Sequence, residues 1–195
     1  FVYIQQLFGD LGLQNFNNRK IAQHPEQLNT LFPKVLGAKF LFLLFFALIV
    51  SCTTMIFGYG GYLGNYLLVI LLTQMALSLL LYMRTNISGS GRYFTDSTFS
   101  VLDKLILIGI LVYLLWVNEP NSGFQLIHFL WAQFASILLT ILLVFLYTHR
   151  KLVKISLRID WHFTKKLMRD SLPYATLVLL MAGYSRLDGV MLERL

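Results

Sequence analysis

Cysteine and charged residues are both scarce in this chain of 195 residues. The single cysteine, Cys52, excludes an internal disulfide and a cluster of thiolate metal ligands. Charged residues make up only 13% of the sequence, whereas 57% of it is hydrophobic. A soluble domain of this length cannot bury that much apolar side chain. The composition therefore predicts an integral membrane protein.

Motifs for catalysis are also lacking. The sequence has no Gly-x-Ser-x-Gly nucleophile motif, and the glycine-rich stretch at residues 58–64 lacks the strand and helix that a phosphate-binding loop requires. The histidines lie in four different segments without metal-ligand spacing: His24, His128, His149 and His162. We therefore predict no enzyme activity, no metal site and no cofactor.

Long apolar blocks are what the sequence does contain. Five of them approach the roughly 20 residues that a helix needs to cross the hydrocarbon of a bilayer. They cover about residues 36–57, 62–83, 101–117, 124–147 and 172–195, and a further helix is expected at about residues 1–15. The predicted fold class is an all-α polytopic helical bundle. Because the chain has no initiator methionine and ends inside its last block, we expect it to be a piece of a larger protein.

Basic residues alternate between the connections. Arg19, Lys20, Lys34 and Lys39 are assigned to the segment before the first full span, and further Lys and Arg residues fill the connections around 84–100 and 148–171. The connections around 58–61 and 118–123 have none. By the positive-inside rule, the basic connections are predicted to be cytoplasmic. Topology and contacts with lipid headgroups explain the net charge of +7, so no nucleic-acid partner is predicted.

Two of the basic connections also have apolar patterns. Leu28, Leu31, Phe32, Val35 and Leu36 recur at helical spacing, which predicts an amphipathic helix lying along the headgroups before the first full span. Residues 153–163 instead alternate apolar and polar side chains. This period of two favours an extended or strand-like stretch on the membrane surface.

The last apolar block carries charges in its second half. Arg186 and Asp188 follow a long uncharged run that is predicted to start at Leu172, with Pro173 in its first turn. A charge near the centre of a span costs about 2.5–3.5 kcal/mol on insertion scales. Residues two apart point to different sides of a helix, so each of these side chains needs water, a ligand or a partner elsewhere. Arg186 could also extend towards the outer interface.

Two stretches resemble the MATE-like flippases that export lipid-linked O-antigen and capsule oligosaccharides. "FGDLGLQNFNNRKIAQ" resembles the pattern at the cytoplasmic end of that family's second helix, and "LPYATLVLLMAGYSRLDGVMLERL" resembles its seventh helix. The matching positions are Asp10, Gly12, Arg19, Ile21 and Ala22 in the first stretch, and Pro173 and Asp188 to Leu192 in the second. The chain would then cover about helices two to seven.

The resemblance implies two six-helix lobes that work by alternating access. Residues 1–171, with a basic linker at 148–171, would belong to the N-terminal lobe, and residues 172–195 would be the first helix of the C-terminal lobe. The implied cargo is a polyprenyl-pyrophosphate-linked oligosaccharide crossing the bacterial inner membrane. Membrane lipids and other polysaccharide-assembly proteins are the further partners. Arg186 and Arg19 would bind the cargo, and Asp188 and Asp10 would serve coupling or gating.

Two other functions remain open from the sequence. A cation-coupled drug exporter of the same superfamily would need a mainly acidic cavity, whereas here an arginine accompanies the aspartate. A membrane-embedded polysaccharide polymerase or acyltransferase would be indicated by a clustered intramembrane His or Asp pair or by a large outer loop.

Overall fold

The computed structural model describes residues 12–24, 26, 28–56, 62–117, 125–152 and 160–193. Helices account for nearly all of these residues, which contain no strand. The helices are α2 (Leu13–Gln23), α3 (Leu28–Ile56), α4 (Tyr62–Gly89), α5 (Tyr93–Val117), α6 (Leu126–Lys151) and α7 (Trp161–Glu193). The all-α fold class is confirmed.

Four of these helices are long and apolar enough to cross a membrane. They are Leu28–Ile56, Gly64–Gly89, Tyr93–Trp116 and Leu126–Lys151, which correspond to the first four full blocks of the sequence. The chain is therefore a polytopic membrane protein. Helix α7 is not among the four, so the crossing predicted for residues 172–195 stays a prediction.

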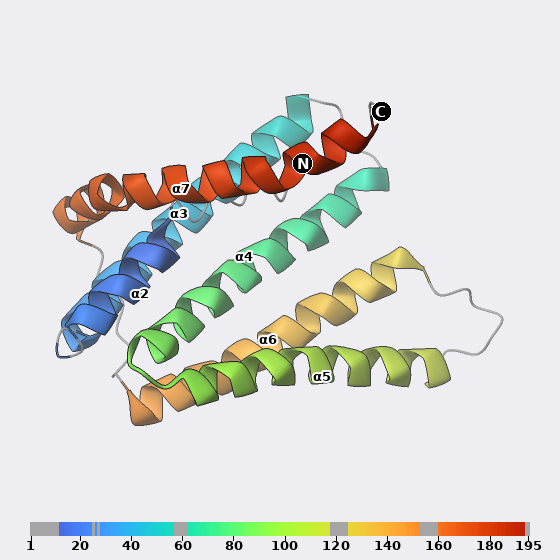
Figure 1. Ribbon diagram of the computed structural model, residues 1–195. Helices are drawn as coiled ribbons and strands as arrows, with labels where there is room; N and C mark the ends of the chain where they lie inside the picture. The colour runs from blue at the N-terminus through green and yellow to red at the C-terminus, as the bar shows by residue number, and fades with distance from the viewer. Residues whose placement is uncertain are drawn as a thin grey trace.

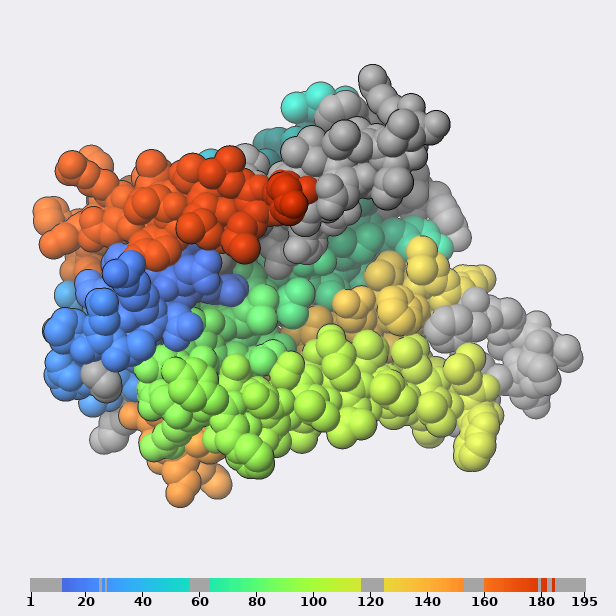
Figure 2. Space-filling view, viewed as in Figure 1, coloured from blue at the N-terminus to red at the C-terminus, as the bar shows by residue number. Residues whose placement is uncertain are grey.

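Helices α2 and α3 connect α7 to the group of α4, α5 and α6, because each of them contacts both α4 and α7. Helices α4, α5 and α6 contact one another, and α7 contacts α2 and α3. Figure 1 shows the start of α3, the end of α4, the start of α5, the end of α6 and the start of α7 at the same end of the molecule, together with α2. In the space-filling view of Figure 2, α2 lies between α7 and the adjoining ends of α4 and α5. The basic connections thus share one end of the bundle.

The amphipathic helix predicted to lie along the headgroups is not a separate element. Residues 28–36 are the first turns of α3, and their apolar side chains are buried inside the bundle. The Tyr82 hydroxyl of α4 donates a hydrogen bond of 2.9 Å to the Phe32 carbonyl oxygen. The prediction of a helix along the headgroups is wrong because the spacing of apolar residues is the same for a helix face that packs on another helix and for one that packs on lipid.

Helix α7 begins at Trp161, eleven residues before the predicted start at Leu172. The predicted first residue is therefore wrong, and so are the predicted bounds of the linker, 148–171. Asp160 caps the helix: its carboxylate accepts the Phe163 N–H at 3.0 Å, and its carbonyl oxygen accepts the Thr164 N–H at 2.9 Å. The bond from Phe163 holds the pKa of Asp160 below its usual value, and Lys34 forms an ion pair with it at 3.4 Å. Pro173 consequently lies inside the helix.

The prediction of an extended stretch over residues 153–163 is also wrong for the helical residues at its end, Trp161–Phe163. Residues 153–159 lie outside the described part of the chain. The alternation of apolar and polar side chains continues past the Asp160 cap into the first turn of α7, so a period of two does not mark an extended segment there.

Helix α2 replaces the end of the predicted span over residues 1–15. Residues 1–11 lie outside the described part of the chain, but Gly12 adopts a φ of 70° and α2 starts at Leu13. A left-handed residue interrupts a right-handed helix, so a continuous helix through residue 15 is excluded. The other spans differ only at their ends, with α4 reaching Gly89, α5 starting at Tyr93 and α6 ending at Lys151.

The predicted orientation can be tested by labelling single cysteines in intact cells. With Cys52 replaced, Asn121→Cys should react with a membrane-impermeant maleimide, whereas Ser156→Cys should react only after the cells are permeabilised. Both positions lie in connections, one without basic residues and one rich in them. Labelling of position 156 in intact cells, without labelling of position 121, would reverse the orientation.

Candidate functional site

The junction of α2 with α7 brings the two stretches of the predicted site together. Gly12 lies so close to α7 that a Cβ atom there would be 2.5 Å from the Ala175 backbone nitrogen and 2.7 Å from the Tyr174 carbonyl carbon. Its positive φ adds a second reason for glycine at this position. The two backbones are therefore in direct contact.

Arg19 lies on the exposed surface of the same junction. Its Nη1 donates a hydrogen bond of 3.1 Å to the Tyr174 hydroxyl oxygen, and the Tyr174 ring packs edge-on against Phe16 with centroids 6.0 Å apart. Among the residues that the structure describes, no carboxylate pairs with Arg19. A guanidinium has five N–H donors, so most of those on Arg19 stay available to an anion.

The side chains of the other three predicted site residues lie outside the described part of the chain. Asp10 lies outside the described residues. Arg186 and Asp188 lie on the backbone of α7, well after Tyr174, but their side chains are outside the described part of the chain. Of the four predicted residues, Arg19 alone has a described side-chain environment.

A buried polar network attaches α2 to the rest of the bundle. The Asn17 side-chain amide donates a hydrogen bond of 3.0 Å to the Asn86 side-chain oxygen of α4, and both residues are almost fully buried. The Asn86 amide in turn donates to the Tyr82 carbonyl oxygen at 2.6 Å. Buried polar groups need such partners, so the pair fixes the position of α2 on α4. Helix α2 is thereby bonded to α4 on one side and to α7 on the other.

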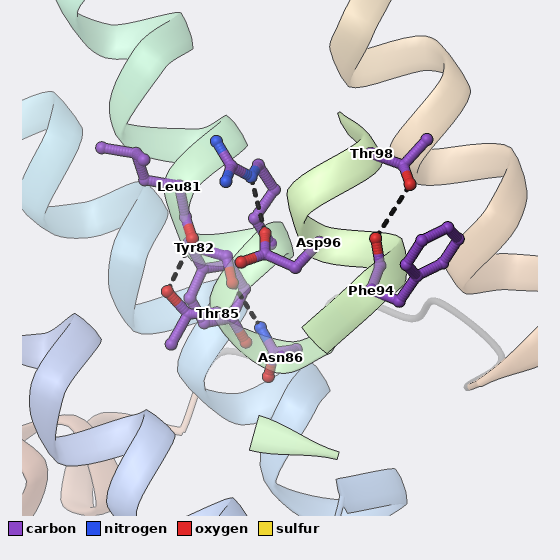
Figure 3. Close-up of polar contacts among 8 residues, drawn as sticks. Leu81, Tyr82, Thr85, Asn86, Phe94, Asp96 and Thr98 are labelled. Carbon is purple, nitrogen blue, oxygen red and sulfur yellow. Dashed lines mark hydrogen bonds and ion pairs between the residues drawn. The ribbon is translucent and has the colours of Figure 1, made fainter. Parts of the chain in front are cut away.

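The ends of α4, α5 and α6 are joined by a second polar cluster. The Arg84 guanidinium of α4 donates to the Asp96 carboxylate of α5 at 2.7 Å, and Figure 3 shows the Asp96 side chain turned towards α4. Arg92, in the turn between these helices, donates to the Tyr147 hydroxyl of α6 at 3.1 Å. This pairing was not predicted from the sequence, although the acidic residue 12 positions after Arg84 was a usable signal.

Lys39 was assigned to a connection, and that assignment is wrong. It lies inside α3 with a side chain that is 0% exposed. The apolar residues that surround it in the sequence were the signal for this position. An ionisable residue buried inside a membrane helix is costly, so such a residue usually serves a function.

No protein-family model, curated protein or solved structure matches the chain. Support for a function therefore comes from the arrangement of the residues themselves.

Proposed function

We propose that the chain forms part of a flippase that moves polyprenyl-pyrophosphate-linked oligosaccharides across the bacterial inner membrane. The membrane-embedded helical bundle and the resemblance of its two end stretches to the flippase family support this proposal. In it, helices α2 to α6 belong to the N-terminal lobe, and α7 is the first helix of the second lobe.

The observation that carries the proposal is the contact between α2 and α7. It joins the arginine-bearing stretch of one lobe to the first helix of the other through Gly12, Arg19 and Tyr174. A pyrophosphate entering the membrane needs fixed cations, because unpaired desolvation of its charge is prohibitive. Arg19 presents unpaired donors at the predicted cytoplasmic face, where such a cargo would enter.

In this mechanism the junction is a cytoplasmic gate. The hydrogen bond from Arg19 to a neutral hydroxyl is weaker than a charge-assisted bond to phosphate, so an arriving pyrophosphate competes for the guanidinium. Loss of the bond to Tyr174 frees α7 to move relative to α2. Arg186 then receives the anion deeper in the cavity, while Asp10 and Asp188 serve coupling or gating.

A reversible cross-link across the junction tests the proposal. The variant carries Phe16→Cys and Tyr174→Cys in the full-length protein with Cys52 replaced, and it is expressed in a bacterial strain that lacks its own flippase. A short bifunctional thiosulfonate should join α2 to α7 and stop the appearance of surface polysaccharide, because the lobes can no longer separate. A reducing agent should restore export.

Two controls identify the cause of the block. In each single-cysteine variant, the same reagent should cause no further loss of export. Export that persists with the cross-link complete would contradict gating at this junction. Failure of the unmodified protein to restore polysaccharide, together with new resistance to cationic drugs, would replace the flippase with the drug exporter.

A further inference from the structure

A recess between α3 and α7 lies apart from the junction of α2 with α7. Its volume is about 430 Å³. Helix α3 contributes Leu41, Phe42 and Phe45, and helix α7 contributes Trp161, Lys165 and Met168. The aromatic and aliphatic side chains make its wall apolar, and Lys165 supplies an ammonium group. The volume falls in the range of about 300–1,000 Å³ typical of sites for small molecules.

Charge around the recess is strongly positive. The first ten residues of α7 contain three basic residues, Lys165, Lys166 and Arg169, and one acidic residue, Asp170. The acidic cap, Asp160, is already paired with Lys34. Lys165 and Arg169 are four residues apart and therefore lie on the same face of α7. Among the described residues, no carboxylate is paired with either side chain, and Lys165 itself lines the recess.

We infer that this recess binds one anionic phospholipid of the cytoplasmic leaflet. Its acyl chain lies along Phe42, Phe45 and Met168, and its phosphate contacts the Lys165 ammonium and the Arg169 guanidinium. Basic pockets between membrane helices on the cytoplasmic side are suited to phosphate headgroups. Trp161 fits the headgroup level, since its ring is amphipathic and 72% of it is exposed.

The affinity for this lipid depends on charge more than on burial of its acyl chain. An acyl chain leaves one apolar environment for another when it moves from the bilayer into the recess, so its transfer contributes little. Each cation near the membrane surface favours an anionic lipid by about fivefold. A zwitterionic lipid of the same acyl chains should occupy the recess correspondingly less.

Quenching of Trp161 fluorescence tests the inference. Every other tryptophan, Trp116 and Trp131 among them, is replaced by phenylalanine, and the protein is placed in phosphatidylcholine vesicles. Phosphatidylglycerol with brominated acyl chains should bind near Trp161 about 25-fold more strongly than brominated phosphatidylcholine, because Lys165 and Arg169 each contribute about fivefold. A variant that retains only Trp131, on α6 and outside the recess, should show no such preference.

Substitution of two neighbouring lysines distinguishes lipid binding in the recess from a general attraction of anionic lipids to the positive surface. Lys165→Gln should reduce the preference about fivefold, whereas Lys166→Gln should retain it, because Lys166 is exposed but does not line the recess. Both substitutions are at exposed positions, so neither disturbs the core. Equal losses in the two variants, preference retained in both, or equal quenching by both lipids at Trp161 would overturn the inference.

Discussion

Gly12→Ala is expected to destabilise the protein far more than Gly91→Ala, although both glycines have a positive φ. The two values are 70° and 81°, and a non-glycine residue in this region costs about 1–3 kcal/mol. At Gly91 nothing lies within 4 Å of a new Cβ atom, so this strain is the whole effect. At Gly12 the new atom would also meet the backbone of α7 at 2.5 Å and 2.7 Å.

The backbone of α7 cannot yield in the way that a flexible side chain can. Overpacking of this kind costs about 1–3 kcal/mol in addition to the strain. The free energy of unfolding, measured in detergent micelles with increasing denaturant, should therefore fall about twice as far for Gly12→Ala as for Gly91→Ala. Equal losses would contradict the close packing of α2 against the backbone of α7.

Arg186→Ala is expected to abolish export by the full-length transporter while leaving its insertion unchanged. The helix starts at Trp161, but its long uncharged run starts at Leu172. Arg186 lies 14 residues after Leu172, or roughly 21 Å further along α7, which is beyond the middle of a hydrocarbon core about 30 Å thick if the run enters the hydrocarbon at its first residue. A bidentate contact with a phosphate would make two charge-assisted hydrogen bonds there. Their loss should reduce export about 100-fold or more, as measured by surface polysaccharide in the flippase-deficient strain.

Conservative and surface substitutions define the role of Arg186. Arg186→Lys keeps the charge but loses the planar fork, so part of the activity should remain. Arg150→Ala removes an exposed arginine at the end of α6 and should leave export unchanged. If Arg186 only extends to the outer interface, the Ala and Lys variants will both export normally. Normal polysaccharide with Arg186→Ala at matched expression would remove its role in cargo binding.

Hydropathy predicted the membrane helices well because the apolar length of a span is set by the bilayer. It located their ends less well, because a helix can continue beyond the hydrocarbon. Helix α4 runs on to Gly89, where Gly91 with its positive φ follows, and α7 starts at the Asp160 cap. These ends depend on single residues that make specific hydrogen bonds or turns, and such residues change the average hydropathy very little.

Packing between distant helices could not be predicted from one sequence. The Asn17–Asn86 amide pair and the contact of Arg19 with Tyr174 join helices far apart in the chain, and each uses residue types that are also common on surfaces. Arg19 was predicted as a site residue through a resemblance, but its partner Tyr174 was not. Lys39 was misplaced because it was grouped with the lysine and arginine residues before it instead of with the apolar run after it.

The junction of α2 with α7 also has a consequence for the time course of synthesis. Arg19 and Tyr174 are 155 positions apart, so all of the intervening helices are translated before the contact can form. At about 5–20 residues per second, the interval between the two residues is about 8–30 s. During that time Phe16 has no Tyr174 ring to pack against, and the α7-facing side of α2 is uncovered. Helix α2 is thus synthesised early but gains its contacts with α7 late, and cellular proteases and chaperones can act on it during that interval.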